Sequence, residues 1–254
     1  MNLDEISALF PLAKTAPDLS KINQQQSISQ EIYKSRMKDY QLRLLNLQRR
    51  MMNTKHSLIM VVEGPDAAGK GGSIKRVSEK LDPRNVRVYS IIKPTTEEYQ
   101  HHYLWRFWNK IPGRGQITVF DRSWYGRVLV ERVENFATKE EWRRAYREIN
   151  EFERQLVDDG TVIVKLFLMI DKEEQLERFK RREADPYKHW KISEEDWRNR
   201  RGWDAHIEAA QDMFNLTSTR AAPWNLIPAN YKWFARMETI RLVVKALEDL
   251  NLPK

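Results

Sequence analysis

A glycine-rich turn between an apolar run and an amphipathic stretch constrains the fold of this chain most strongly. Residues 58–62, Leu-Ile-Met-Val-Val, predict a buried parallel strand, and Ile74, Val77 and Leu81 follow at helical spacing. The intervening segment 64–70, Gly-Pro-Asp-Ala-Ala-Gly-Lys, matches the pattern G-x-x-x-x-G-K. In that pattern backbone N–H groups surround phosphate oxygens, and the lysine and the helix N-terminus add positive charge. The flanking strand and helix favour such a phosphate cradle over an ordinary strand-to-helix turn.

Two positions depart from the usual form of this pattern. The Ser or Thr that normally follows the lysine and binds magnesium is Gly71 here. Asp66 lies inside the cradle, where a negative charge beside phosphate is costly unless a cation or a proton intervenes. We therefore expect Asp66 to be a magnesium-linked or catalytic residue.

Composition narrows the classes of partner. The 254 residues include 44 Lys and Arg against 36 Asp and Glu, for a net charge of +8. This charge favours an anionic partner, such as nucleic acid, an acidic membrane surface or a polyphosphorylated small molecule. Because the chain has no cysteine, disulfides, thiolate metal sites and a cysteine nucleophile are excluded. We find neither an N-terminal apolar leader nor an apolar run of bilayer length, and expect a cytoplasmic protein without membrane contact.

Apolar periodicity predicts a single domain of alternating strands and helices over residues 1–254. Its expected parts are an extended arm at 1–26, an N-terminal helix at 27–53, a core with the phosphate cradle at 57–177, a basic lid at 178–200 and C-terminal helices that complete the core at 201–254. Further strands are expected at 86–92, 117–120, 161–170 and 224–228, and an aromatic-rich helix at 95–110. The apolar face of the N-terminal helix packs on the domain or pairs with a partner subunit, so a homo-oligomer is expected.

A second acid follows another predicted strand. Asp121 comes directly after the apolar run 117–120. Catalytic residues of parallel sheets gather at the carboxyl ends of strands, so Asp121 is expected beside the cradle, where it holds magnesium directly or through water. Capping the next helix is an alternative role that is compatible with the first. Farther on, the basic segment 178–191 predicts a mobile lid over phosphates, or else a solvated turn.

Taken together, these motifs are more specific than the cradle alone. Three stretches resemble the polyphosphate kinase type 2 family: Gly64-x-Asp-Ala-Ala-Gly-Lys-Gly-Gly, Phe120-Asp-Arg-Ser-Trp-Tyr-Gly-Arg, and Arg178-x3-Arg182 with Pro186-x3-Trp190-Lys191. The resemblance covers about residues 30–250. The segments 124–134, 193–200 and 222–224 are most similar to the polyphosphate:AMP phosphotransferase branch of that family.

This resemblance implies a fold, a reaction and a set of partners. The fold is α/β, a three-layer P-loop kinase fold related to thymidylate kinase, with a central parallel sheet flanked by helices and a helical lid. The reaction is a reversible transfer of a phosphoryl group between inorganic polyphosphate and an adenine or guanine nucleotide. AMP is the first choice of acceptor, and ADP or GDP the others. Mg²⁺ is the expected cofactor, with Mn²⁺ as a substitute, and nucleic acid is not expected as a partner.

The resemblance also implies roles for individual residues. Asp66 and Asp121 would be magnesium-linked carboxylates, with Asp66 placed to orient or deprotonate the attacking phosphate. Lys70 would contact the transferred phosphoryl group, and Arg122 and the lid residues Arg178 and Arg182 would neutralise charge around it. The expected phosphate-binding residues are Gly64, Ala67, Ala68, Gly69, Lys70, Gly71, Gly72, Ser73, Lys75 and Arg76. Of these, Lys75 and Arg76 line a groove for the polyphosphate chain together with Lys80, or else are plain surface charges.

Two other functions stay open on the sequence. An ATP-dependent nucleoside monophosphate kinase would share the fold, the cradle and the lid, although such enzymes usually carry Ser or Thr where Gly71 stands. A non-catalytic module that binds polyphosphate or nucleic acid would use the basic surface and the nine tryptophans. Replacing Asp66 or Asp121 by Asn distinguishes these classes, because an enzyme loses turnover whereas a pure binder keeps its ligand.

Overall fold

A parallel sheet forms the centre of the molecule. The computed structural model describes residues 10, 12–187 and 189–252, with Lys191 described by its backbone alone. The sheet has five strands in the order β2-β3-β1-β4-β5. These are β1 (Ser57–Glu63), β2 (Val86–Ser90), β3 (Ile117–Asp121), β4 (Thr161–Met169) and β5 (Trp224–Pro228). Every neighbouring pair is parallel, so the chain must cross over between strands, and helices provide these crossovers.

The helices occupy the segments between the strands and both ends of the chain. They are α2 (Gln30–Met51), α3 (Lys70–Ser78), α4 (Thr96–Tyr99), α5 (Trp105–Trp108), α6 (Val130–Val133), α7 (Lys139–Asp158), α8 (Lys172–Glu183), α9 (Glu194–Arg201), α10 (Trp203–Thr217) and α11 (Lys232–Glu248). The long α7 begins with the expected capping box between Thr138 and Glu141. None of the described helices is long and apolar enough to cross a bilayer.

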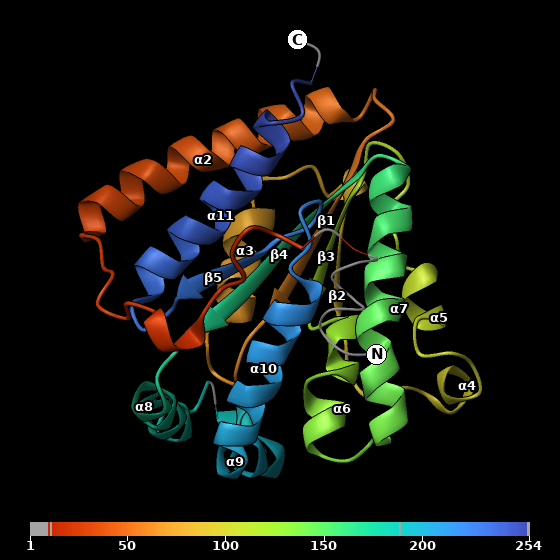
Figure 1. The fold of residues 1–254 in the computed structure, drawn as a ribbon. Helices are drawn as coiled ribbons and strands as arrows, with labels where there is room; N and C mark the ends of the chain where they lie inside the picture. The colour runs from red at the N-terminus through yellow and green to blue at the C-terminus, as the bar shows by residue number, and fades with distance from the viewer. Residues whose placement is uncertain (1–9, 11, 188, 253–254) are drawn as a thin grey trace.

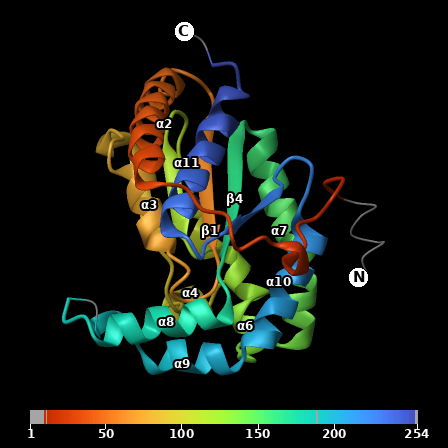
Figure 2. The ribbon, with the colours of Figure 1, turned by 90° about the vertical axis from the view of Figure 1, so that its left-hand side faces the viewer.

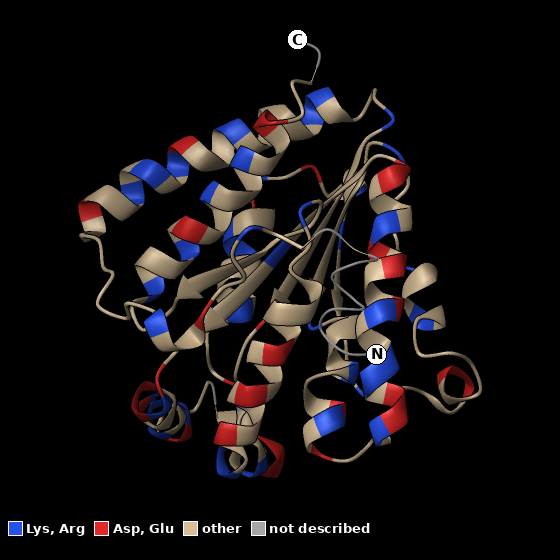
Figure 3. Ribbon diagram, viewed as in Figure 1, with Lys and Arg blue, Asp and Glu red and all other residues tan. Residues whose placement is uncertain are grey.

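Helices cover both faces of the sheet (Figures 1 and 2). Side chains alternate along a strand, so Leu58, Met60 and Val62 of β1 join the core with α2, α3 and α11. Ile59 and Val61 join the opposite core, which α7 and α10 close. All these β1 side chains are fully buried, and the charged residues lie mainly on the surrounding helices (Figure 3). The predicted three-layer α/β fold with a central parallel sheet is confirmed.

The apolar face of the N-terminal helix packs within the chain. Met37, Leu44 and Met51 of α2 are buried in the core that α11 shares, and the two helices lie side by side in Figures 1 and 2. Packing on the domain is therefore the alternative that the structure supports. The expected homo-oligomer has no support from this face and stays a prediction.

The stretch predicted as one aromatic helix at 95–110 forms two short helices instead, α4 and α5. A capping box between Thr95 and Glu98 starts α4, which ends at Tyr99. The chain then turns so that Phe107 packs its ring edge-on against Phe120 and Trp124. The prediction of one continuous helix was wrong: the turn at residues 100–104 separates α4 from α5 and places Phe107 in the core, whereas Tyr99 and Trp108 stay exposed.

Of the predicted arm, residues 1–9 and 11 lie outside the described part of the chain. Farther along, Leu12 forms an isolated antiparallel bridge with Thr219, and Leu19 is buried against the core of α7 and α10. The segment predicted as a lid, 178–200, includes the second half of α8 and most of α9, and these two helices lie beyond the carboxyl ends of the strands in both views (Figures 1 and 2). Because α8 begins at Lys172, its first turns precede the predicted lid boundary.

Candidate active site at the carboxyl ends of the strands

The phosphate cradle connects β1 directly to α3. At Gly64 the backbone has a φ of +136°, and a Cβ atom would lie 2.2 Å from the carbonyl oxygen of Leu168 in β4. Only glycine fits so close to the neighbouring strand. Helix α3 begins at Lys70, and the preceding Gly69 has no side chain to cap it. The first N–H groups of α3, which like those of any helix have no intrahelical partner, also receive no side-chain cap, and such an N-terminus favours an anion.

Lys70 folds back onto the cradle. Its Nζ donates to the carbonyl oxygens of Gly64, at 2.6 Å, and Pro65, at 3.1 Å. Burial lowers the pKa of Lys70 below its ordinary value and the neighbouring Arg122 acts in the same direction, while Asp66 and Asp121 oppose the shift. The ammonium group is thus poised beside the loop that would surround a phosphate.

The carboxylate of Asp66 is held by two donors from different elements. Arg122 donates to Oδ1 at 2.6 Å, and Asn199 of α9 donates to Oδ2 at 2.8 Å. Burial by itself raises the pKa of Asp66, but Lys70 and Arg122, with the hydrogen bonds from Asn199 and Arg122, hold it below the ordinary value. Asp66 is therefore an ionised carboxylate of fixed direction, with its side chain only 11% exposed.

Asp121 stands beside the start of α3. In the parallel pair of β1 and β3, Asp121 lies opposite Val62. Its Oδ2 atom is 3.9 Å from the position that a Cβ atom on Gly71 would occupy. A carboxylate thus occupies the neighbourhood into which the usual Ser or Thr would project its hydroxyl.

The two acids form a donor set that suits magnesium. Mg²⁺ is usually bound by one or two carboxylates and completes its shell with water and substrate phosphates. Among the described residues no three His, Cys, Asp or Glu side chains gather as a metal-binding cluster. Both oxygens of Asp66 already accept hydrogen bonds, so Asp121 is the better placed of the two for direct ligation.

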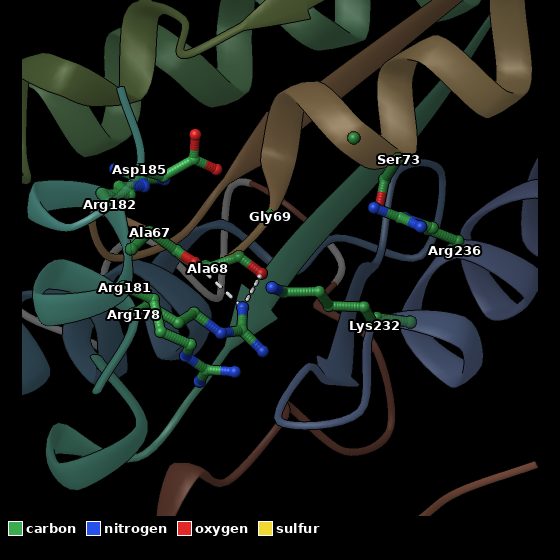
Figure 4. A pocket seen from close by; sticks show the side chains of 12 residues that line it. Ala67, Ala68, Gly69, Ser73, Arg178, Arg181, Arg182, Asp185, Lys232 and Arg236 are labelled. Carbon is green, nitrogen blue, oxygen red and sulfur yellow. Dashed lines mark hydrogen bonds between the residues drawn. The ribbon is translucent and has the colours of Figure 1, made fainter. Parts of the chain in front are cut away.

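The guanidinium of Arg178 braces the cradle from α8. It donates to the carbonyl oxygens of Ala67 and Ala68, at 2.9 and 3.0 Å, and to those of Ala229 and Asn230 after β5, at 2.7 and 2.9 Å. Figure 4 shows the bonds to the cradle. Arg178 is only 3% exposed, and its hydrogen bonds connect the cradle loop to the loop that follows β5. The family pattern implies a charge-neutralising role, and the contacts add a structural one.

A basic cavity of about 440 Å³ opens on one side of the cradle. Its cradle wall consists of residues 67–69, Gly72 and Ser73, and its cations are Arg178, Arg181, Arg182, Lys232 and Arg236 (Figure 4). The guanidinium of Arg236 lies so close to α3 that a Cβ on Gly72 would be 3.2 Å from it. Burial, together with Arg178 and Arg181, lowers the pKa of Lys232. Glu174 pairs with Arg178 and Arg181 and Asp185 also lines the cavity, but the cations outnumber these acids, and the surplus positive charge favours an anion.

The basic cavity only partly matches the expected phosphate-binding set. Of that set, residues 67–69, Gly72 and Ser73 line it, and so does Arg182, which was predicted as a charge-neutralising lid residue. Lys75 is exposed outside it, and Arg76 turns toward α2, where it donates to the Tyr33 hydroxyl at 3.3 Å and to Glu79 at 3.1 Å. The sequence reasoning missed Lys232 and Arg236. Their only signal was basic charge in the first turns of the last helix, which the topology brings to the cradle.

A second cavity, of about 100 Å³, lies against the other part of the same loop. Residues 63–66 and Arg122 form its polar end, and apolar side chains of the segments 126–130 and 203–210 form its walls. Glu63, which sequence reasoning also missed, accepts a hydrogen bond from the Ser123 hydroxyl at 2.8 Å. Burial raises the pKa of Glu63 above its ordinary value.

Comparisons with known proteins agree with this geometry. The family described as "Polyphosphate kinase 2 (PPK2)" matches residues 27–254. The chain is 51% identical to a polyphosphate:AMP phosphotransferase of Pseudomonas aeruginosa over 230 residues, which are 91% of this chain and 46% of that protein. It is 54% identical to one of Acinetobacter johnsonii over 191 residues, 75% of this chain and 40% of that protein. The chain therefore spans less than half of the length of these two relatives.

A solved structure covers nearly the whole chain. The crystal structure of polyphosphate kinase 2 from Arthrobacter aurescens TC1 is similar with a TM-score of 0.91 and 35% sequence identity, over 98% of this chain and 92% of that chain. The resemblance found in the motifs is thus confirmed along the sequence and in the fold. This chain belongs to the polyphosphate kinase 2 family.

Proposed function

We propose that this protein transfers the terminal phosphoryl group of inorganic polyphosphate to a nucleotide, with AMP as the preferred acceptor. The main support for this proposal is that two cavities border the same cradle loop. Residues 67–69 border the basic cavity, and residues 64–66 border the cavity with apolar walls. A polyanionic donor and a nucleotide acceptor could therefore meet at Asp66 and Lys70.

The basic cavity suits the donor. Polyphosphate carries charge along its whole length, so its binding requires cations beyond the reacting phosphate. Arg181, Arg182, Lys232 and Arg236 supply them next to the uncapped N-terminus of α3. The proposed polyphosphate groove therefore lies between α8 and α11, and not at Lys75, Arg76 and Lys80, where it was expected from the sequence.

The smaller cavity suits the acceptor nucleoside, with apolar walls for the base and charged groups at the end nearest the cradle. Its volume of about 100 Å³ is below the range of roughly 300–1,000 Å³ that is common for ligand pockets. The lining of this cavity would therefore have to rearrange to admit a nucleotide. The name of the Pseudomonas aeruginosa relative, a polyphosphate:AMP phosphotransferase, supports AMP as the acceptor.

The reaction needs no nucleophilic side chain. A phosphate oxygen of the acceptor attacks the terminal phosphorus of polyphosphate, and the bond from that phosphorus to the bridging oxygen breaks. The shortened chain leaves with the electron pair. Because such transition states are loose, positioning and charge stabilisation supply most of the acceleration. Lys70 would exchange the carbonyl oxygens of Gly64 and Pro65 for phosphate oxygens, and Arg122 would neutralise charge at the reacting group.

Asp66 orients the acceptor phosphate in this scheme, and its ionised form could take a proton from that phosphate. Asp121 would hold Mg²⁺ directly and Asp66 would hold it through water. When bound, Mg²⁺ would neutralise charge on the phosphate oxygens. ATP-dependent phosphorylation of a nucleoside monophosphate is not favoured, because the chain belongs to the polyphosphate kinase 2 family and carries Gly71 after the cradle lysine.

The proposal is tested by comparing donors. Purified protein with Mg²⁺ is incubated with long-chain polyphosphate and AMP, ADP or GDP, and in parallel with ATP and AMP, while chromatography follows the nucleotides. We expect polyphosphate to convert AMP to ADP fastest, with Lys70→Ala inactive. If polyphosphate phosphorylates only ADP or GDP, polyphosphate remains the donor, but AMP is not the preferred acceptor. Turnover with ATP alone would contradict the proposal.

The groove on α11 gives a separate prediction. Removing Lys232 and Arg236 together should raise the KM for polyphosphate by about 10-fold or more, since charged hydrogen bonds each contribute about 1.5–3 kcal/mol. The KM for AMP should change little, because AMP occupies the other cavity. Lys245→Ala on the exposed side of the same helix controls for the loss of charge. An equal rise in both KM values would argue against separate donor and acceptor cavities.

A further inference from the structure

The lid helix α9 contacts the central carboxylate of the site. The side-chain amide of Asn199 donates to Oδ2 of Asp66 at 2.8 Å, across 133 residues of sequence. Arg122, which directly follows β3, donates a hydrogen bond to the other carboxylate oxygen, Oδ1. Only the NH₂ group of an amide can donate to a carboxylate, so this contact also fixes which way the amide of Asn199 faces. The direction of Asp66 is thus set jointly by the core and by the lid.

The carbonyl end of the same amide lacks a partner. Within the described part of the chain, Oδ1 of Asn199 is buried and accepts no hydrogen bond, and Asn199 lines the smaller cavity. A buried acceptor without a donor costs about 1–3 kcal/mol. A donor group brought into that cavity, such as a hydroxyl or an exocyclic amine of a nucleoside, would remove this cost.

Other contacts dock α9 independently of Asn199. Arg198 pairs with Glu134 after α6 at 2.5 Å. Arg200 donates to Oε1 of Gln175 in α8 at 3.2 Å, and the ring of Trp197 meets that of Phe179 edge-on, with centroids 5.2 Å apart. The Arg198–Glu134 and Trp197–Phe179 contacts therefore anchor the helix without touching Asp66, whereas Gln175 also donates to the backbone oxygen of Asp66 at 3.1 Å. This separation lets an experiment distinguish a role in holding the helix from a role in orienting Asp66.

We propose that Asn199 is a positioning residue that couples the lid to the reaction. When α9 closes, the NH₂ group of Asn199 reaches Asp66 and fixes the direction of its carboxylate. A donor group of the bound nucleotide then hydrogen-bonds to Oδ1 of Asn199 and stabilises the closed position of the helix. An occupied acceptor site thereby orients the catalytic carboxylate. The role in nucleotide binding rests on the function proposed above, whereas the coupling of α9 to the cradle does not.

Three variants test the coupling. Asn199→Leu removes the contact to Asp66 and the one proposed to the nucleotide. Asn199→Gln keeps an amide on a longer side chain, and Arg198→Gln loosens the helix without touching Asp66. In Asn199→Leu we expect kcat to fall by about 10²-fold, as for a misplaced catalytic group. Its KM for AMP should rise and its KM for polyphosphate should stay the same. Asn199→Gln should recover part of kcat. Arg198→Gln should change kcat by about threefold or less, because the arginine side chain of that pair is 46% exposed.

Hydrogen exchange provides a readout that needs no turnover. In Asn199→Leu the amides of residues 64–69 should exchange faster than in the wild type. In Arg198→Gln the increase should be confined to α9. If the two variants behave alike in both kinetics and exchange, Asn199 is only one docking contact among several and the proposal is overturned. If wild-type protein fails to use polyphosphate, the proposed function falls, and the exchange comparison still decides the role of Asn199.

Discussion

Asp66→Asn is expected to lower kcat by about 10²- to 10⁴-fold, the range for loss of an acid–base or orienting group. Asparagine keeps the size of the side chain but removes the negative charge that Arg122 and Lys70 surround. The fold should survive, because the backbone oxygen of Asp66 would still accept from Gln175, at 3.1 Å in the wild type. Steady-state kinetics with polyphosphate and AMP measures the effect, and thermal unfolding checks the fold.

Binding separates this variant from a damaged protein. Without the Asp66 charge beside phosphates, polyphosphate should bind as tightly as in the wild type or more tightly, which calorimetry measures. Asp158→Asn at the exposed end of α7 controls for the loss of one negative charge. A variant that kept wild-type kcat would show that Asp66 neither orients nor deprotonates the acceptor.

The second large effect concerns stability. Lys165 lies in the middle of β4, fully buried, and its Nζ donates to Glu153 of α7 at 2.8 Å, to the Tyr125 hydroxyl at 2.8 Å and to the carbonyl oxygen of Thr217 at 2.7 Å. Glu153 in turn accepts from the Tyr125 hydroxyl at 2.7 Å and from Trp124 Nε1 at 3.1 Å. This network anchors the loop that follows Arg122, a residue whose φ of +64° lies in the left-handed region.

Lys165→Met should lower the free energy of unfolding by about 3–5 kcal/mol, because it leaves the carboxylate of Glu153 buried without its cation. Chemical denaturation measures the loss. The double variant Lys165→Met/Glu153→Gln should recover a large part of it, since a neutral amide can still accept from Trp124 and Tyr125. A loss well below 1 kcal/mol in the single variant would mean that Glu153 is not charged in the folded protein.

The parts of the site that could be predicted are those that local sequence encodes. The cradle is a contiguous pattern with its own strand and helix. Asp121 was placed correctly because parallel strands end at a common edge of the sheet. Likewise, the buried strand 58–62 and the capping box at Thr138 depend on neighbouring residues alone. In each case the information lies within one element or follows from a general rule of sheet topology.

The parts that could not be predicted depend on contacts between distant segments. Lys232 and Arg236 reach the basic cavity only because β5 leads α11 back to the cradle. Asn199 meets Asp66 only because α9 packs beside the cradle, 133 residues farther along the sequence. Lys165 interrupts an apolar strand, and nothing local shows that α7 supplies its partner. Spacing alone could not assign Arg178 its four backbone carbonyl oxygens.

The central claim is that the nucleotide receives its phosphoryl group directly from polyphosphate. The most direct measurement supplies polyphosphate labelled with ³²P, unlabelled AMP and Mg²⁺ without ATP, and locates the label in the products. The account predicts that the label appears in the β-phosphate of ADP and that Lys70→Ala abolishes its transfer. ADP formed from ATP and AMP in a parallel reaction, with no label passing from polyphosphate to any nucleotide, would contradict it.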